Sequence, residues 1–290
     1  MGNPAPLIPE FKTMELDFTQ PPAQDEGYDP AVARKCFESF GKTENFAELE
    51  TFFTEGQASD KMYLLVDGEV SLVRNKKTLD IVKPGEIFGE IAVITRQPRT
   101  ASAMARKFCQ VLVLDAGQFQ QALQHATPEF ALMLMNIMNN RLRLTIALMK
   151  QTAILPGLDD RDELRVFDKK MMDELVAAFR ARPPQTFPAG RIIMKEGDAG
   201  VSMYIVIRGR VSVSIKATVV ERVGPGGTFG EMALVDHASR SATAVADTEC
   251  QLLSINRSDF LNLVKTKPGF GISLLKTIAD RLRNMTAQKK

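Results

Sequence analysis

Residues 88–102 read FGEIAVITRQPRTAS, and residues 229–243 read FGEMALVDHASRSAT. The two stretches align without a gap at a separation of 141 residues, so that a glycine, a glutamate, an alanine and an arginine recur at matching places. Glu90 and Arg99 of the first stretch correspond to Glu231 and Arg240 of the second. This shared spacing indicates an internal duplication, with one copy of the same unit in each half of the chain.

The residue types of the repeated stretch suit a sugar phosphate. A glycine before a short apolar run predicts a tight turn into a helix, whose first free amide N–H groups attract an anion. The arginine adds a permanent positive charge in a planar fork that fits a phosphate. The glutamate would repel a phosphate, but its oxygens can accept a hydrogen bond from a sugar hydroxyl. Together these groups predict a ribose-phosphate pocket in each half of the chain.

Both stretches resemble the phosphate-binding cassette of cyclic-nucleotide-binding domains, a family of eight-stranded β-rolls with flanking helices. We call residues 88–102 the first cassette and residues 229–243 the second cassette. The resemblance covers nearly all of residues 44–290, as two tandem domains. It implies that the two glutamates hold the ribose 2′-hydroxyl and that the two arginines hold the cyclic phosphate. The ligand-binding residues that it implies are Phe88, Gly89, Glu90, Ile91, Ala92, Arg99, Thr100 and Ala101 in the first copy, and Phe229, Gly230, Glu231, Met232, Ala233, Arg240, Ser241 and Ala242 in the second.

The implied ligand is cAMP or cGMP, with no further cofactor. Thr100 and Ser241 follow the two arginines and each offers a hydroxyl that can turn toward a guanine amine. One neutral hydrogen bond contributes about 0.5–1.5 kcal/mol, so we expect both nucleotides to bind with a modest preference at most. We favour cAMP, because it is the commoner ligand of soluble tandem relatives.

Short β-type runs between glycine and proline turns predict the fold of both halves. Asp67-Gly68 lies between two apolar runs and is a strong hairpin signal, and the turn glycines at 56, 68 and 85 recur at 197, 209 and 226. The expected fold class is mainly β with flanking α, as two tandem eight-stranded β-rolls of the double-stranded β-helix or jelly-roll type. Leu49 stands opposite Gly190, so we expect the first domain to make its opening turn differently.

Helices are predicted before and after each roll. Asp29 followed by Pro30 predicts a helix to about residue 40, and a second such helix is predicted over 168–181. The helices after the rolls are predicted over 128–149 and 268–286. The predicted organisation is a flexible N-terminal segment (1–27), a first domain with its following helix (28–150), a linker (151–167) and a second domain (168–290).

The predicted helix 128–149 carries an apolar stripe longer than one roll needs. Two alternatives stay open for this stripe: packing within the chain, or a seam with a second copy in a homodimer. The stripe consists of Leu134, Ile137, Met138, Leu142, Ile146 and Met149.

Composition excludes several classes of function. The net charge of +2 is too small to predict binding to nucleic acid or to an anionic membrane. No apolar run reaches the roughly 18 residues that a membrane span requires, so we expect a cytoplasmic protein with no membrane partner. Cys109 and Cys250 stand 141 residues apart and are expected to be buried strand thiols in a reducing compartment. With two histidines in the chain we expect no metal site, and no catalytic motif is found, so no enzyme is expected.

Two kinds of regulator share these features. A transcription regulator of the catabolite-activator type would continue into a helix-turn-helix domain after the second roll. Only four residues follow the last predicted helix, so we expect no DNA binding by this chain alone. A regulatory subunit of cyclic-AMP-dependent protein kinase shares the tandem arrangement but would carry an Arg-Arg pseudosubstrate, and residues 1–43 contain no Arg-Arg pair. We expect a non-enzymatic receptor that signals through movement of the helix after the roll, with a protein partner or a homodimer formed through helix 128–149.

Overall fold

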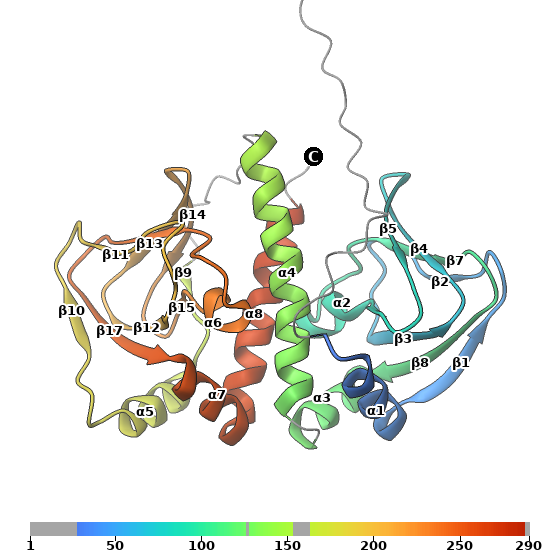
Figure 1. The fold of residues 1–290 in the computed structure, drawn as a ribbon, viewed down its shortest axis with the longest axis horizontal. Coiled ribbons are helices and arrows are strands. Elements are labelled where there is room, and N and C mark those ends of the chain that lie inside the picture. Colours follow the sequence, from blue (N-terminus) through green and yellow to red (C-terminus); the bar gives the residue numbers. More distant parts are fainter. Residues whose placement is uncertain (1–27, 126–127, 153–162, 288–290) are drawn as a thin grey trace, which may run out of the picture.

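The computed structural model describes residues 28–125, 128–152 and 163–287. Two β-rolls lie on either side of a central pair of helices (Figure 1). These helices are α4 (Pro128–Thr152), which follows the first roll, and α8 (Pro268–Ala287), which follows the second. The predicted flexible segment 1–27 and most of the predicted linker lie outside the described residues.

The first roll consists of eight strands in two sheets, as predicted, with strand orders β1-β8-β3-β6 and β2-β7-β4-β5. Helix α1 (Pro30–Phe40) precedes the roll, α2 (Glu90–Thr95) lies between β6 and β7, and α3 (Ala116–His125) follows β8. The strands are β1 (Lys42–Phe46), β2 (Thr51–Phe53), β3 (Lys61–Asp67), β4 (Val70–Arg74), β5 (Lys77–Val82), β6 (Ile87–Phe88), β7 (Ser102–Ala105) and β8 (Cys109–Asp115).

The second roll repeats this topology, with strand orders β10-β17-β12-β15 and β11-β16-β13-β14-β9. Helix α5 (Lys169–Ala178) precedes it, α6 (Met232–Asp236) lies between β15 and β16, and α7 (Arg257–Thr266) follows β17. The strands are β9 (Glu163–Leu164), β10 (Gln185–Phe187), β11 (Ile192–Met194), β12 (Ser202–Arg208), β13 (Val211–Ile215), β14 (Thr218–Val223), β15 (Thr228–Phe229), β16 (Thr243–Ala246) and β17 (Cys250–Asn256).

Strand β9 is an addition that the sequence analysis placed in the linker. It pairs in parallel with β14, where Glu163 is the partner of Arg222 and Leu164 the partner of Val223. A two-residue strand is held by main-chain hydrogen bonds to an edge strand, so its side chains carry no alternating pattern from which it could be predicted. The linker therefore ends inside the sheet of the second domain.

Helix starts follow the predicted caps. The Asp29 carboxylate accepts a hydrogen bond from the Ala31 amide at the start of α1, and the Asp168 carboxylate accepts one from the Met171 amide in α5. Helix α5 ends three residues earlier than predicted, and α3 and α7 were not predicted. Both missed helices follow a strand directly, although each begins at a capping side chain: Asp115 accepts a hydrogen bond from the Gln118 amide, and Asn256 accepts one from the Asp259 amide.

The prediction that the first domain makes its opening turn differently is wrong. Leu49 adopts the left-handed conformation with φ 67°, and Gly190 adopts it with φ 79°. The two residues also donate equivalent backbone hydrogen bonds, from Leu49 to the Ala105 carbonyl (2.9 Å) and from Gly190 to the Ala246 carbonyl (2.8 Å). The turn is therefore the same in both domains, and the leucine tolerates a backbone conformation that costs an L-residue roughly 1–2 kcal/mol.

Leu49→Gly is expected to raise the free energy of unfolding by about 0.5–1 kcal/mol, because glycine relieves the left-handed strain at the cost of some unfolded-state entropy. The Leu49 side chain is 68% exposed, so little packing is lost. Gly190→Ala is the matched control and is expected to destabilise the chain, because its added Cβ meets no atom within 4 Å and only the backbone strain remains. Urea denaturation of the two variants measures both effects, and a destabilised Leu49→Gly protein contradicts the argument.

The apolar stripe of α4 is buried within the chain. All six of its residues are at most 8% exposed, and α4 packs along α8 between the two rolls (Figure 1). The stripe is therefore already covered by the second domain, which corrects the alternative of a homodimer seam through helix 128–149. Cys109 and Cys250 are buried, unpaired strand thiols, as predicted.

Candidate functional site

The first cassette folds around Gly89 and Arg99. Gly89 has φ 76°, and a Cβ at this position would lie 2.7 Å from Nη1 of Arg99, so only glycine fits here. The Arg99 guanidinium donates from Nη1 to the Gly89 carbonyl and from Nη2 to the Lys61 carbonyl and the Ser59 hydroxyl. It also lies 3.8 Å from the centre of the Phe53 ring. These contacts hold one face of the fork in place.

Arg99 carries a charge that the protein does not fully neutralise. Its side chain is buried, at 3% exposure, and its Nε has no hydrogen-bond partner among the described residues. Burial lowers the pKa of Arg99 from its ordinary value, while the nearby Tyr63 and Glu90 raise it. A buried cation with an unused donor is costly unless an anion completes its contacts. The position therefore fits an anionic ligand.

Glu90 connects the first cassette to α4. Its carboxylate is buried and forms an ion pair with Arg141, which projects from α4. The same carboxylate thus contacts the helix and is close enough to Arg99 to raise the pKa of its guanidinium. The sequence analysis found Glu90 and Arg99 but not Arg141.

The second cassette repeats this geometry. Gly230 has φ 82°, and an added Cβ would lie 2.7 Å from Nη1 of Arg240. Arg240 donates to the Gly230 carbonyl at 2.7 Å and to the Ser202 carbonyl at 2.5 Å. Burial lowers its pKa, while Tyr204 and Glu231 raise it. The two arginine sites are therefore built in the same way.

Two substitutions change the surroundings of the second arginine. Gly200 stands where the first domain has Ser59, and Met194 stands where it has Phe53. A Cβ on Gly200 would lie 3.0 Å from the Arg240 guanidinium, so a side chain at this position would crowd the arginine. The hydroxyl and ring contacts of the first site thus have no equivalent in the second.

Glu231 is held by a more extensive network than Glu90. Arg281 on α8 donates to Glu231 (2.5 Å), to both oxygens of Glu221 (3.0 and 3.1 Å) and to the Thr228 carbonyl (2.7 Å). Burial alone would lower the pKa of Arg281, but the carboxylates of Glu221 and Glu231 raise it above its ordinary value. Oε2 of Glu231 is buried and has no hydrogen-bond partner among the described residues, so it can accept one from a ligand hydroxyl.

The remaining predicted site residues take two kinds of position. Phe88 and Phe229 belong to the roll cores, where their rings stack on Tyr63 (5.0 Å between centroids) and Tyr204 (5.4 Å). They are core residues at the start of each cassette. Ala92, Ala101, Ala233 and Ala242 are buried, and Ile91 and Thr100 are partly buried. Ser241 Oγ lies 3.3 Å from the buried Met232 sulfur.

Arg141 and Arg281 are the main residues that the sequence analysis missed. The Arg-Leu pairs at 141–142 and 281–282 recur in register between the two following helices, and this recurrence was the available signal. Because the helices lie some 50 residues from the cassettes in the sequence, nothing local showed that the arginines contact the glutamates.

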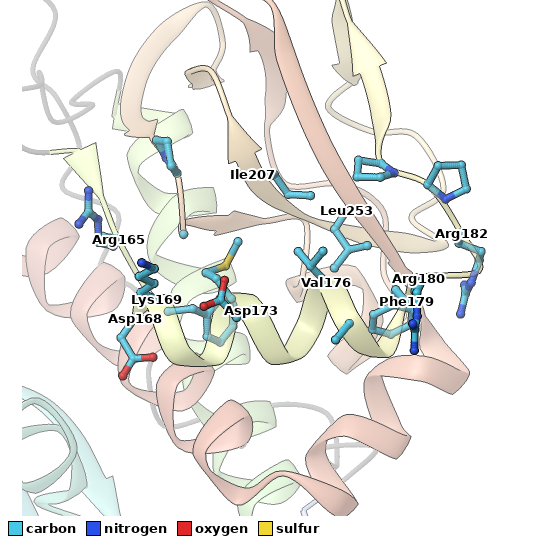
Figure 2. A pocket seen from close by; sticks show the side chains of 17 residues that line it. Arg165, Asp168, Lys169, Asp173, Val176, Phe179, Arg180, Arg182, Ile207 and Leu253 are labelled. Carbon is cyan, nitrogen blue, oxygen red and sulfur yellow. The ribbon is translucent and has the colours of Figure 1, made fainter.

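A large cleft lies away from both cassettes, between α5 and the second roll. Its volume is about 1040 Å³, and Figure 2 shows Val176 of α5 pointing toward Ile207 and Leu253 of the roll. When α1 and α5 are aligned on their capping aspartates, Val176 corresponds to Phe37, which is fully buried. The smaller side chain fills less of the space, so we assign the cleft to incomplete packing and the functional site to the cassettes.

Residues 28–125, 128–152 and 163–287 contain no group of three or more side chains able to hold a metal ion. Within the same ranges, no helix is long and apolar enough to cross a membrane.

Comparison with known proteins identifies the class. The model of the cyclic nucleotide-binding domain matches residues 43–126 and again residues 184–267, and the two matches span more than half of the chain. The chain therefore belongs to the family of cyclic nucleotide-binding domain proteins and carries two such domains in tandem. The buried glutamate and arginine of each cassette lie inside the matched ranges.

Individual relatives differ in how much of the chain they match. A cAMP-dependent protein kinase regulatory subunit from Yarrowia lipolytica is 26% identical over 217 residues, which cover 74% of this chain and 52% of the relative. A cyclic nucleotide-gated potassium channel from Rhizobium etli is 38% identical over 116 residues, which cover 40% of this chain and 32% of the channel. The chain thus spans about half or less of the length of these relatives. Among solved structures, the regulatory domain of Toxoplasma gondii PKA with cAMP is 19% identical, with a TM-score of 0.31 over 86% of this chain and 96% of that one.

Proposed function

We propose that this chain is a cyclic-nucleotide receptor that binds one cAMP or cGMP in each roll and acts as a regulatory protein without catalysis. The observation that carries the proposal is the repeated buried pair of Glu90 with Arg99 and of Glu231 with Arg240. Burying a charged side chain costs folding free energy, and packing alone does not offset this cost for four charged residues at equivalent places in two diverged domains. An anionic sugar ligand gives each of them a partner.

The residues have separate tasks in this proposal. Arg99 and Arg240 supply the positive charge for the cyclic phosphate, and Glu90 and Glu231 accept the hydrogen bond of the ribose hydroxyl. Each glutamate is already bonded to an arginine of the following helix. A nucleotide that bonds to the glutamate therefore alters the glutamate-arginine contact that holds the following helix. The position of that helix then depends on whether the nucleotide site is occupied.

The partner that we propose is a cytoplasmic protein kinase catalytic subunit, bound without an Arg-Arg pseudosubstrate in residues 1–43. The match to the Yarrowia regulatory subunit runs over 217 residues and so extends through both domains, whereas the match to the channel has the length of one domain. A tagged chain used to capture proteins from its native cell, without nucleotide and with cAMP or cGMP, tests this point. Capture of a kinase that is released by the nucleotide supports the proposal, and capture unaffected by either nucleotide contradicts it.

Cyclic nucleotide is expected to raise the melting temperature of the chain. A ligand at about one hundred times its dissociation constant stabilises the folded state that binds it by roughly 2.7 kcal/mol. Differential scanning fluorimetry with cAMP, cGMP and linear 5′-AMP measures the shift, and the linear nucleotide is the control for a nonspecific phosphate effect. A melt that neither cyclic nucleotide moves at millimolar concentration rejects the receptor function.

A further inference from the structure

The cleft between α5 and the second roll has an apolar floor and positively charged ends. Val176 of α5 is 41% exposed and points toward Ile207 and Leu253 across the cleft (Figure 2). The basic side chains of the lining lie in two groups in Figure 2, one at each end of the cleft: Arg165 with Lys169, and Arg180 with Arg182. Incomplete packing therefore leaves an apolar surface uncovered between two positive ends.

These features of the cleft are not shared with the first domain. When α1 and α5 are aligned on their capping aspartates, Pro30 takes the place of Lys169, and the fully buried Phe37 takes the place of Val176. The cleft is therefore no requirement of the β-roll fold, and its chemistry is particular to the second domain.

The lining of the cleft keeps a net positive charge. Asp168 and Asp173 also line it, so four basic and two acidic side chains give a net charge of +2. Asp168 is engaged as the cap of α5, and Arg182 pairs with Asp259 at 2.7 Å. The other three basic side chains are exposed, and none is shown in an ion pair with a described residue. Apolar side chains carried beside negative charges would therefore complement the cleft.

Residues 14–18 of the chain have this complementary chemistry. They read Met-Glu-Leu-Asp-Phe and lie outside the described residues. In an extended conformation alternate side chains point to opposite sides, so the three apolar groups would share one side and the two carboxylates the other. Residues 14–27 hold four acidic residues and no basic one. Five extended residues span about 13 Å, against roughly 16 Å from residue 169 to residue 180 at the helical rise, so the segment fits the cleft in length.

We propose that residues 14–18 dock in this cleft of the same chain, with their apolar side chains on its floor and their carboxylates toward its basic ends. Ten residues join residue 18 to Tyr28, where the described part of the chain begins, and an extended stretch of that length reaches about 35 Å. Covalent attachment holds the segment near the cleft at a high effective concentration, so that even weak contacts keep it docked. This inference does not depend on nucleotide binding.

A tryptophan reporter tests the docking. The sequence contains no tryptophan, so Leu16→Trp in the full chain gives a single fluorophore within the segment. We expect its emission at shorter wavelength, and weaker quenching by acrylamide, than for the matched control Gln24→Trp, which lies outside residues 14–18. Val176→Phe introduces the residue found in α1 and fills the floor of the cleft. In this variant the ratio of docked to free segment is expected to fall about tenfold or more, the equivalent of losing one buried apolar side chain.

Charge reversal provides a second and independent test of the docking. Lys169→Glu/Arg180→Glu is expected to release the reporter, and adding Glu15→Lys/Asp17→Lys is expected to restore part of its protection. The matched control is Lys76→Glu/Lys77→Glu, which reverses two exposed lysines of the first roll and should leave the quenching unchanged.

Protection of the reporter that persists on dilution and is lost in both cleft variants supports the proposal. Equal quenching of Leu16→Trp and Gln24→Trp overturns it, as does protection that survives both the filled and the charge-reversed cleft. Protection that disappears on dilution assigns the segment to a second copy of the chain and overturns docking within one chain.

Discussion

Arg281→Met is expected to lower the free energy of unfolding by about 3–5 kcal/mol, because it leaves the buried carboxylate of Glu231 and the partly buried carboxylate of Glu221 without their cation. Arg281 bonds Glu221, Glu231 and the Thr228 carbonyl, and no other basic side chain is shown bonding these carboxylates in the described part of the chain. Chemical denaturation at neutral pH measures the loss. The matched variant is Arg141→Met, which leaves the single carboxylate of Glu90 and is expected to cost less. Equal losses for the two variants would contradict the comparison.

The loss in Arg281→Met is expected to shrink as the pH falls from 7 toward 5. Burial already raises the pKa of Glu221, and Arg281 opposes this rise in the unmodified chain. Without the guanidinium the folded-state pKa rises further above its unfolded value, so the folded chain binds a proton that the unfolded chain does not. Stability then increases as the pH is lowered through that window. Arg281→Met/Glu221→Gln is the control, since it lacks the Glu221 carboxyl and should show a smaller pH effect.

The second large effect is expected at the phosphate arginines. Arg99→Ala should weaken nucleotide binding in the first roll and leave the second roll titratable, and Arg240→Ala should do the converse. Losing one charge-assisted contact costs about 1.5–3 kcal/mol, or roughly 12- to 150-fold in dissociation constant. Arg106→Ala is the control, because this arginine forms a surface pair with Glu69 at 2.8 Å and lies outside the cassettes. An unchanged two-site isotherm for either cassette variant removes that arginine from its pocket.

The rolls could be predicted from the sequence because individual residues within each turn mark its position. The turn glycines at 56, 68 and 85 and their partners 141 residues later all have positive φ, so each marks a place where the chain reverses. The turn at Leu49 was not predicted, because a leucine does not indicate a left-handed backbone conformation. The short helices α3 and α7 were missed although Asp115 and Asn256 cap them, because each follows a strand with no loop between the two elements. The strand β9 was missed because it is only two residues long.

The candidate site was predictable to the extent that it is contiguous in sequence. Glycine, glutamate and arginine lie within eleven residues of one another in each cassette, so their shared chemistry is visible in the sequence alone. The arginines at 141 and 281 act from helices whose position depends on tertiary packing. Their contacts follow from how α4 and α8 lie between the rolls, which no local pattern contains.

The placement of α4 and α8 against each other within one chain has a consequence for how the protein behaves on dilution. If two separate chains supplied these helices, their contact would come apart at low protein concentration, and nucleotide affinity would vary with the amount of protein present. A covalent link keeps the local concentration of the second helix high and constant. The two halves of one chain also need not be identical, as Ser59 beside Arg99 and Gly200 beside Arg240 illustrate. Each half can therefore evolve its own ligand preference.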